Sequence, residues 1–149
     1  MSDIQKFTFK FGFVDRTIIG GPYHKRFPDH LGIKMAEEIN TPCDIDIPTR
    51  DFNVPNMETL DMGVRYSLMS IAKNKKVYVG CMGGCGRTGL YFGALAKVLD
   101  IPEPIKYVRA NFKAHAIETK QQENYITSYK PSLKTRLVAS VAKAISLAY

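Results

Sequence analysis

The residues most able to do chemistry lie together at 81–89. Five residues separate Cys81 from Arg87, three of them glycines, and Thr88 and Gly89 follow. A glycine-rich turn before a helix can aim several backbone N–H groups at one point, and the positive end of the helix adds to them. This field binds an anion the size of phosphate and favours the thiolate of a cysteine at the start of the turn. An arginine at the end of the turn can hold two phosphate oxygens. The spacing therefore predicts a phosphate cradle with a nucleophile beneath it.

The segments on either side of this turn predict a buried strand before it and a buried helix after it. Residues 75–80 contain the apolar run Val77-Tyr78-Val79, and residues 88–99 are apolar nearly all round. Residues 57–73 carry apolar side chains three and four apart, which is typical of an amphipathic helix.

Three more helices are predicted at 103–112, 119–129 and 132–147. In the last of these, one apolar stripe is expected to face the core. It consists of Leu133, Leu137, Val141 and Ile145.

The N-terminal half predicts short strands. Alternating phenylalanines from Phe7 to Phe13 indicate a strand with one buried face, and we expect a turn at Asp15-Arg16 before a second strand at 17–19. Residues 30–40 are a helix candidate. A short strand is expected at 43–47 and a loop at 49–55. The order of elements predicts an α/β fold in which a central, mostly parallel sheet is flanked by helices, with 1–149 as one domain.

Composition excludes several classes of protein. Of the 149 residues, 45% are hydrophobic and 23% charged, which is ordinary for a globular chain and excludes general disorder. No uncharged run approaches the roughly 20 residues of a transmembrane helix, and residues 1–13 lack a signal peptide's apolar block. Three cysteines are too few for a disulfide framework, so we expect a reducing, cytoplasmic setting. The net charge of +7 favours anionic partners without choosing among them.

Residues 80–89 resemble the phosphate loop of the cysteine-dependent protein tyrosine and dual-specificity phosphatases, whose pattern is His-Cys-x-x-Gly-x-Gly-Arg-Thr-Gly. The resemblance implies that Cys81 is the nucleophile, that Arg87 binds phosphate and that Thr88 stabilises the departing thiolate. It also implies a set of residues around the phosphate: Met82, Gly83, Gly84, Cys85, Gly86 and Arg87. One position departs from the pattern. Gly80 stands where the family has a histidine that helps to hold the loop and tune the thiol.

Two further segments extend the resemblance. Residues 50–55 are similar to the mobile acid loop of the family, which implies that Asp51 is the general acid and base. Residues 116–122 are similar to the run that places a glutamine near the site, which implies that Gln122 positions the attacking water. By residue type alone, several neighbours compete for these roles: Asp44, Asp46, Asp61 and Gln121.

The function implied is hydrolysis of phosphotyrosine, with phosphoserine and phosphothreonine left open, through a phosphocysteine intermediate. The resemblance implies no metal and no cofactor, because Arg87 and the loop supply the positive charge. The expected partner is a phosphorylated protein or peptide, with nucleic acid not favoured and no membrane. Cys43 or Cys85 could form a reversible disulfide with Cys81, although a small apolar filler is the simpler interpretation of each. The oligomeric state stays open.

Other functions fit parts of the same sequence pattern. An RNA 5′-phosphatase and a phosphoinositide phosphatase of the same superfamily remain alternatives, although the loop interior holds no lysine that would favour the latter. A catalytically weak phosphate-binding module is a further alternative. Residues 84–89 also read Gly-x-Gly-x-x-Gly, but the chain after Gly89 lacks the second strand of a dinucleotide-binding unit. A nucleotide-hydrolase phosphate loop does not fit the spacing, and a rhodanese-like sulfurtransferase would not need Asp51 or Gln122.

Overall fold

The computed structural model describes residues 3–149 and contains one five-stranded sheet in the order β1-β2-β5-β3-β4. The strands are β1 (Gln5–Phe11), β2 (Val14–Pro22), β3 (Leu31–Ala36), β4 (Ile45–Thr49) and β5 (Val77–Cys81). The β1–β2 pair is an antiparallel hairpin, while β2, β5, β3 and β4 run parallel to one another. The predicted α/β fold with a mostly parallel sheet flanked by helices is confirmed.

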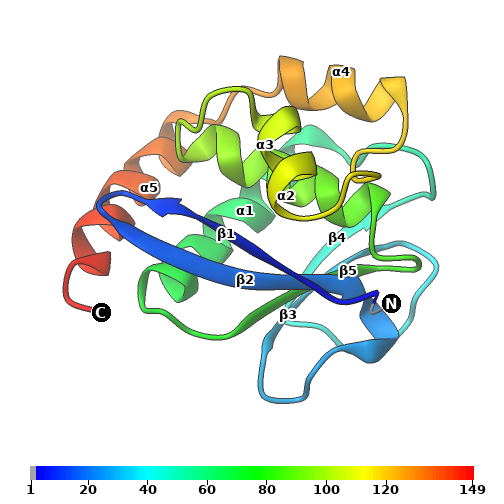
Figure 1. The fold of residues 1–149 in the computed structure, drawn as a ribbon, viewed down its shortest axis with the longest axis horizontal. Helices are drawn as coiled ribbons and strands as arrows, with labels where there is room; N and C mark the ends of the chain where they lie inside the picture. Colours follow the sequence, from blue (N-terminus) through cyan, green and yellow to red (C-terminus); the bar gives the residue numbers. More distant parts are fainter. Residues whose placement is uncertain (1–2) are drawn as a thin grey trace.

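Five α-helices and one short 3-10 helix complete the described residues. They are η1 (Tyr23–Lys25), α1 (Met57–Ala72), α2 (Gly86–Val98), α3 (Pro104–Asn111), α4 (Lys120–Ser128) and α5 (Leu133–Ser146). Figure 1 shows α2, α3 and α4 gathered on one side of the sheet, while η1 and its loop lie on the other. No helix within residues 3–149 has both the length and the apolar character needed to cross a lipid bilayer.

The middle of the sheet is buried on both faces. All five residues of β5 are buried, and α2 packs against this strand with twelve buried residues. On the helix side, the ring of Phe7 stacks on that of Phe92 with 4.5 Å between centroids. On the other side, Tyr78 of β5 meets the ring of Phe27 edge to face. The turn between β5 and α2 is therefore held at both ends by buried elements.

The predicted helix at 30–40 is wrong, because residues 31–36 form β3. Ile33 and Ala36 are spaced like one face of a helix, yet Gly32 to Ala36 are all buried, as in an interior parallel strand. A Cβ on Gly32 would lie 2.5 Å from the Tyr23 hydroxyl, so the glycine also lets η1 pack closely against this strand.

The predicted turn at Asp15-Arg16 is also wrong. The hairpin turns at Gly12 and Phe13, and Phe13 is 87% exposed while Phe7, Phe9 and Phe11 are buried. Arg16 lies inside β2 and is buried, where its guanidinium donates to the carbonyls of Ile71, Ala72 and Ser146. A buried arginine thus satisfies the last carbonyls of α1 and the end of α5, which local turn signals could not indicate.

The apolar stripe predicted to bury α5 faces outward instead. Leu133, Leu137 and Val141 are 73%, 59% and 55% exposed, and only Ile145 of that stripe packs partly against the core. The buried side of α5 is made of small residues: Thr135, Ala139, Ala142 and Ser146. Small side chains let α5 approach α1 closely, so close packing and not hydrophobic periodicity sets the orientation of this helix.

Candidate active site

Cys81 ends β5 and lies beneath the following loop. Its side chain is only 3% exposed, and its Sγ accepts two hydrogen bonds. The N–H of Gly84 donates at 3.2 Å and the hydroxyl of Thr88 at 3.1 Å. Gly84 has φ +79°, a conformation that glycine adopts without steric cost. The loop therefore folds back over the sulfur so that donors point toward it.

The end of β2 packs directly under this loop and explains the residue that precedes the cysteine. A Cβ on Gly80 would lie 2.7 Å from Tyr23 Cα and 2.9 Å from the Gly21 carbonyl oxygen. A Cβ on Gly84 would lie 2.5 Å from the carbonyl carbon of Gly21. Both glycines are thus needed because the backbone of residues 21–23 occupies the space of their side chains. The histidine of the family pattern has no room at position 80.

Arg87 is held from the side opposite the acid loop. It is 2% exposed, and its two terminal nitrogens donate to the two carboxylate oxygens of Glu38 at 2.7 and 2.8 Å. One of them also donates to the carbonyl oxygen of Thr49 at 2.8 Å. The hydrogen bonds from Arg87 lower the pKa of Glu38 to about 2. Burial alone would lower the pKa of Arg87, but the Glu38 carboxylate reverses this and the pKa is raised.

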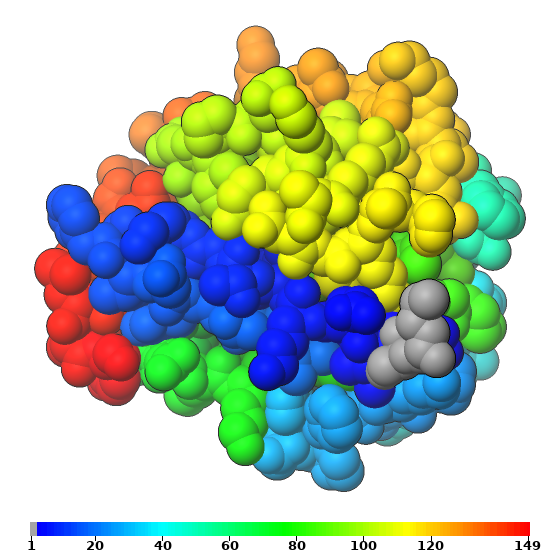
Figure 2. Space-filling view, viewed as in Figure 1, coloured from blue at the N-terminus to red at the C-terminus, as the bar shows by residue number. Residues whose placement is uncertain are grey.

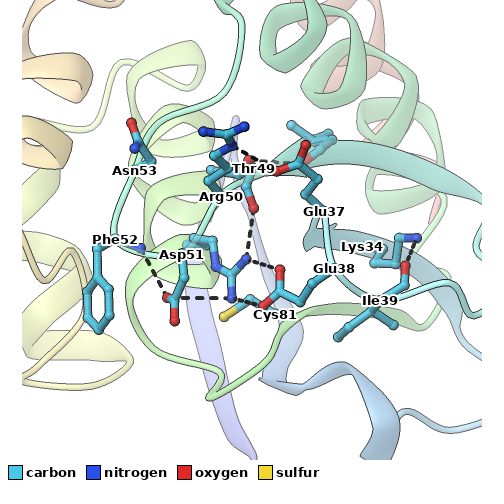
Figure 3. A network of polar contacts seen from close by, with 12 residues as sticks. Lys34, Glu37, Glu38, Ile39, Thr49, Arg50, Asp51, Phe52, Asn53 and Cys81 are labelled. Carbon is cyan, nitrogen blue, oxygen red and sulfur yellow. Dashed lines mark hydrogen bonds and ion pairs between the residues drawn. The ribbon is translucent and has the colours of Figure 1, made fainter.

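Asp51 reaches the same guanidinium from the other side. Its carboxylate lies 3.5 Å from an Arg87 nitrogen and is 55% exposed. It also accepts from the backbone N–H of Phe52, a residue held at φ +59°. Figure 3 shows Asp51 and Glu38 approaching from opposite sides, with the Cys81 sulfur between them in this view. The structure thus brings four of the predicted residues together: Cys81, Arg87, Thr88 and Asp51.

The rival aspartates have other contacts. Asp61 accepts hydrogen bonds from Tyr129, Ser132 and Thr135 and so joins α1 to the start of α5. These hydrogen bonds lower the pKa of Asp61 even though burial acts to raise it. Asp44 accepts from the backbone N–H of Gly32, and Asp46 lies 3.8 Å from the Lys34 ammonium.

Gln122 is completely buried, and both ends of its amide contact backbone groups. Its Oε1 accepts from the N–H of Glu118 at 2.8 Å and of Thr119 at 3.3 Å, which completes a capping box at the start of α4. Its Nε2 donates to the carbonyl oxygen of Asn53 in the acid loop at 3.1 Å. The neighbouring Gln121 is exposed. The structure therefore connects Gln122 to the loop that carries Asp51.

Comparison with known proteins places this geometry in a family. A family model described as Tc-R-P, a polymorphic toxin system DSP-PTPase phosphatase, matches residues 29–99, which hold both the acid loop and the phosphate loop. The solved structure of Tk-PTP in its active form is similar with a TM-score of 0.57 and 25% identity, over 68% of this chain and 78% of that one. The chain is similar to the cysteine-dependent protein tyrosine phosphatase superfamily in its fold and, over residues 29–99, in its sequence.

Other relatives share the superfamily fold or much of the sequence. PTPMT1, solved in complex with PI(5)P, has a TM-score of 0.59 at 17% identity, over 85% of this chain and 92% of that one. Two uncharacterized proteins of Methanocaldococcus jannaschii also match. MJECL20 is 33% identical over 87% of this chain and 85% of its own length. MJ0215 is 36% identical over 56% of this chain, and that match spans about half of the relative, 52% of its length.

Two residues at the site carried no sequence signal. Glu38 lies between β3 and β4, and Lys113 lies between α3 and α4, and neither residue is part of a motif recognised in the sequence. Lys113 donates to the carbonyl oxygen of Gly84 at 3.0 Å. Neither contact is local in the sequence, so neither could be found by spacing.

The remaining cysteines are free thiols. Burial raises the pKa of Cys43 and of Cys85 above the ordinary value. Cys43 is influenced by Asp44 and Asp46 in the β3–β4 connection, whereas Cys85 lies in the phosphate loop beside Lys113. Within residues 3–149, no three His, Cys, Asp or Glu side chains are grouped so that they could hold a metal ion.

Proposed function

We propose that residues 1–149 form one dual-specificity-like domain that hydrolyses phosphotyrosine through a phosphocysteine intermediate. One observation carries the proposal. The Cys81 sulfur receives hydrogen bonds from Gly84 and Thr88 in a loop that ends in a buried arginine. That arginine is paired with Glu38 on one side and approached by Asp51 on the other.

The reaction divides into two displacements at phosphorus. The Cys81 thiolate attacks phosphorus, the bond to the phenolic oxygen breaks, and Asp51 gives its proton to that oxygen. A water molecule then attacks the phosphocysteine, and the Asp51 carboxylate takes a proton from it. The sulfur–phosphorus bond breaks, inorganic phosphate leaves, and the Thr88 hydroxyl donates to the thiolate that is regenerated.

The other site residues stabilise charge and hold position. Arg87 and the N–H groups of residues 82–86 bind the equatorial oxygens in both steps. Gln122 is proposed to position the water. Its hydrogen bond to the Asn53 carbonyl also connects it to the acid loop. The enzyme is proposed to work in the cytoplasm, where a reducing environment keeps Cys81 a free thiol.

The choice of substrate rests on the composition of the loop. Its interior has no lysine, which favours phosphotyrosine over a phosphoinositide that carries additional phosphate groups. The net charge of +7 does not by itself select a nucleic acid. Phosphoserine and phosphothreonine peptides belong in the same assay because the depth of the site decides between them and phosphotyrosine.

Hydrolysis of para-nitrophenyl phosphate in reducing buffer with a metal chelator tests the proposal. The variants are Cys81→Ser, Asp51→Ala and Asp44→Ala, the last as a matched carboxylate outside the site. We expect Cys81→Ser to lose activity by on the order of 10³-fold or more and Asp44→Ala to keep its activity. Asp51→Ala should lose the alkaline limb of the pH profile, because that limb reflects loss of the proton that Asp51 donates. Full activity in Cys81→Ser would overturn the mechanism. Faster hydrolysis of PI(5)P or of an RNA 5′-triphosphate than of phosphopeptides would contradict the proposal that phosphotyrosine is the substrate.

A further inference from the structure

Lys113 touches the phosphate loop from outside. It lies in the segment between α3 and α4 and is partly buried, with its ammonium 5.2 Å from the centre of the Phe112 ring. Its Nζ donates to the carbonyl oxygen of Gly84 at 3.0 Å and also to that of Asp3. Figure 2 shows the yellow segment that follows α3 lying against the dark blue residues near the N-terminus. One ammonium thus joins three separate parts of the chain.

The contact fixes the orientation of one peptide group. The Gly84 carbonyl and the Cys85 N–H belong to the same planar trans peptide, so they point in opposite directions. With the carbonyl held by Lys113, the Cys85 N–H points away from the ammonium. The preceding peptide is fixed independently, because its N–H, on Gly84, donates to Cys81 Sγ at 3.2 Å.

Rotation of the Gly84–Cys85 peptide changes ψ of Gly84 together with φ of Cys85, which is −121° in the structure. Because glycine has no Cβ, it allows a wide range of ψ, so Gly84 does not itself fix the orientation of this peptide. A rotated Gly84–Cys85 peptide would turn its carbonyl oxygen toward the anion site and its N–H away from it. An acceptor would then replace a donor facing the phosphate, and the oxygen would repel the anion.

We propose that Lys113 is a positioning residue of the phosphate cradle, which keeps the Gly84 carbonyl outside so that the Cys85 N–H faces the bound phosphoryl group. This inference rests on the proposed function of the same loop. Lys113 does not touch substrate; it acts through the backbone of Gly84 and Cys85.

The charge of Lys113 also acts on the thiol of Cys85, the next residue of the loop. Burial raises the pKa of the Cys85 thiol, and the Lys113 ammonium opposes that rise. The Glu118 carboxylate also acts on this thiol, in the opposite sense, and its Oε1 lies 2.2 Å from where a Cβ on Gly86 would be. Lys113 therefore contacts the loop at Gly84 and Glu118 approaches it two residues later, at Gly86.

Binding of orthovanadate, an analogue of phosphate, tests the inference directly. Dissociation constants are measured for the wild type, Lys113→Met, Lys113→Arg and Lys106→Met, with the melting temperature of each recorded with and without vanadate. Lys106 is an exposed lysine of α3, so its variant matches the loss of charge without the loop contact. We expect Lys113→Met to bind vanadate about tenfold more weakly, the cost of one hydrogen bond from a charged group. Lys113→Arg should recover most of the affinity, and Lys106→Met should bind as the wild type does.

The outcomes separate this inference from the proposed function. If the wild type fails to bind vanadate, the proposed function and this inference both fall. If the wild type binds it and Lys113→Met binds equally well, only the positioning role is overturned. A lower melting temperature in Lys113→Met with unchanged vanadate affinity also overturns it, since Lys113 would then merely anchor the N-terminal segment through Asp3.

Discussion

Gly80 occupies the position before the nucleophile because the backbone of residues 21–23 fills the space where a side chain would be. The superfamily pattern has histidine there, but in this protein the end of β2 packs against the phosphate loop and holds the loop in place. The Gly84 N–H and the Thr88 hydroxyl provide the contacts to the sulfur. The missing histidine is therefore a consequence of packing at this site.

This packing predicts that a side chain at position 80 destabilises the fold. Gly80→Ala places a Cβ 2.7 Å from backbone atoms, so we expect a loss of about 1–3 kcal/mol in the free energy of unfolding. Gly80→His should lose more. Gly83→Ala is the control, because a Cβ there has no neighbour within 4 Å. Urea unfolding measures all three, and a Gly80→His protein as stable as the wild type would contradict the packing.

Gln122 allows a second prediction at the residue scale. Because its amide holds Asn53, Gln122→Ala should loosen the acid loop and weaken proton donation by Asp51. The rate loss should be larger for phenyl phosphate, which needs its leaving oxygen protonated, and we expect about tenfold or more there. It should be small for para-nitrophenyl phosphate. Gln121→Ala, one residue away and exposed, is the control.

Equal losses for both substrates would show that Gln122 does not act through Asp51. A burst of the phenol with slow release of phosphate would instead locate its effect in the attack of water on the phosphocysteine.

The sequence identified site residues through local spacing or through a motif of the superfamily, as it did Asp51 and Gln122. Cys81 and Arg87 could be found because only five residues separate them within one turn. Glu38 and Lys113 could not, because each approaches the loop from a segment with no spacing or motif to mark it. The histidine's absence was visible in the sequence, whereas its cause, the backbone of Gly21 and Tyr23, needed the fold.

At the scale of elements, the β3–β4 connection stabilises α2 through Glu38 and Arg87. Arg87 lowers the pKa of Glu38 from the ordinary 4.5 to about 2, so the folded protein binds this proton less readily than the unfolded chain does. The stabilisation by this pair is therefore complete above about pH 4.5 and is lost as the pH falls toward 2.

Glu38→Gln tests this linkage. The variant should be less stable at neutral pH, and its stability should fall less steeply than that of the wild type as the pH is lowered through that window. Glu37→Gln is the matched control, because Glu37 pairs only with an exposed Arg50 at 3.5 Å. Denaturant unfolding at a series of pH values measures the difference. If the stability of Glu38→Gln and of the wild type falls equally with acid, the Glu38–Arg87 pair is not the cause of the acid dependence.

The orientation of α5 provides another prediction for an element. Leu137 is 59% exposed, whereas Leu68 of α1 is fully buried. Leu68→Ala should cost about 2–5 kcal/mol of unfolding free energy, and the chemically identical Leu137→Ala should change it by about 0.5 kcal/mol or less. Comparable losses in the two variants would instead support an α5 whose Leu137 side faces the core, as the hydrophobic spacing predicts.

At the scale of the whole molecule, the α/β class and the helices after β5 were predictable because each has a strong local pattern. The order of the strands was not, since β5 enters between β2 and β3, which are adjacent in the sequence. That insertion places the end of β5 beside Gly21 and Pro22 of β2 and near the β3–β4 connection with Glu38. The active-site loop is thus assembled from segments that only the complete sheet brings together.

The central claim is that the phosphoryl group passes through Cys81. The most direct measurement is mass spectrometry of the wild-type protein quenched in acid during turnover of para-nitrophenyl phosphate. We expect a protein heavier by one phosphoryl group, which peptide mapping locates on Cys81 and which Cys81→Ser lacks. Steady turnover with no phosphorylated protein, or with the group on another residue, would contradict it.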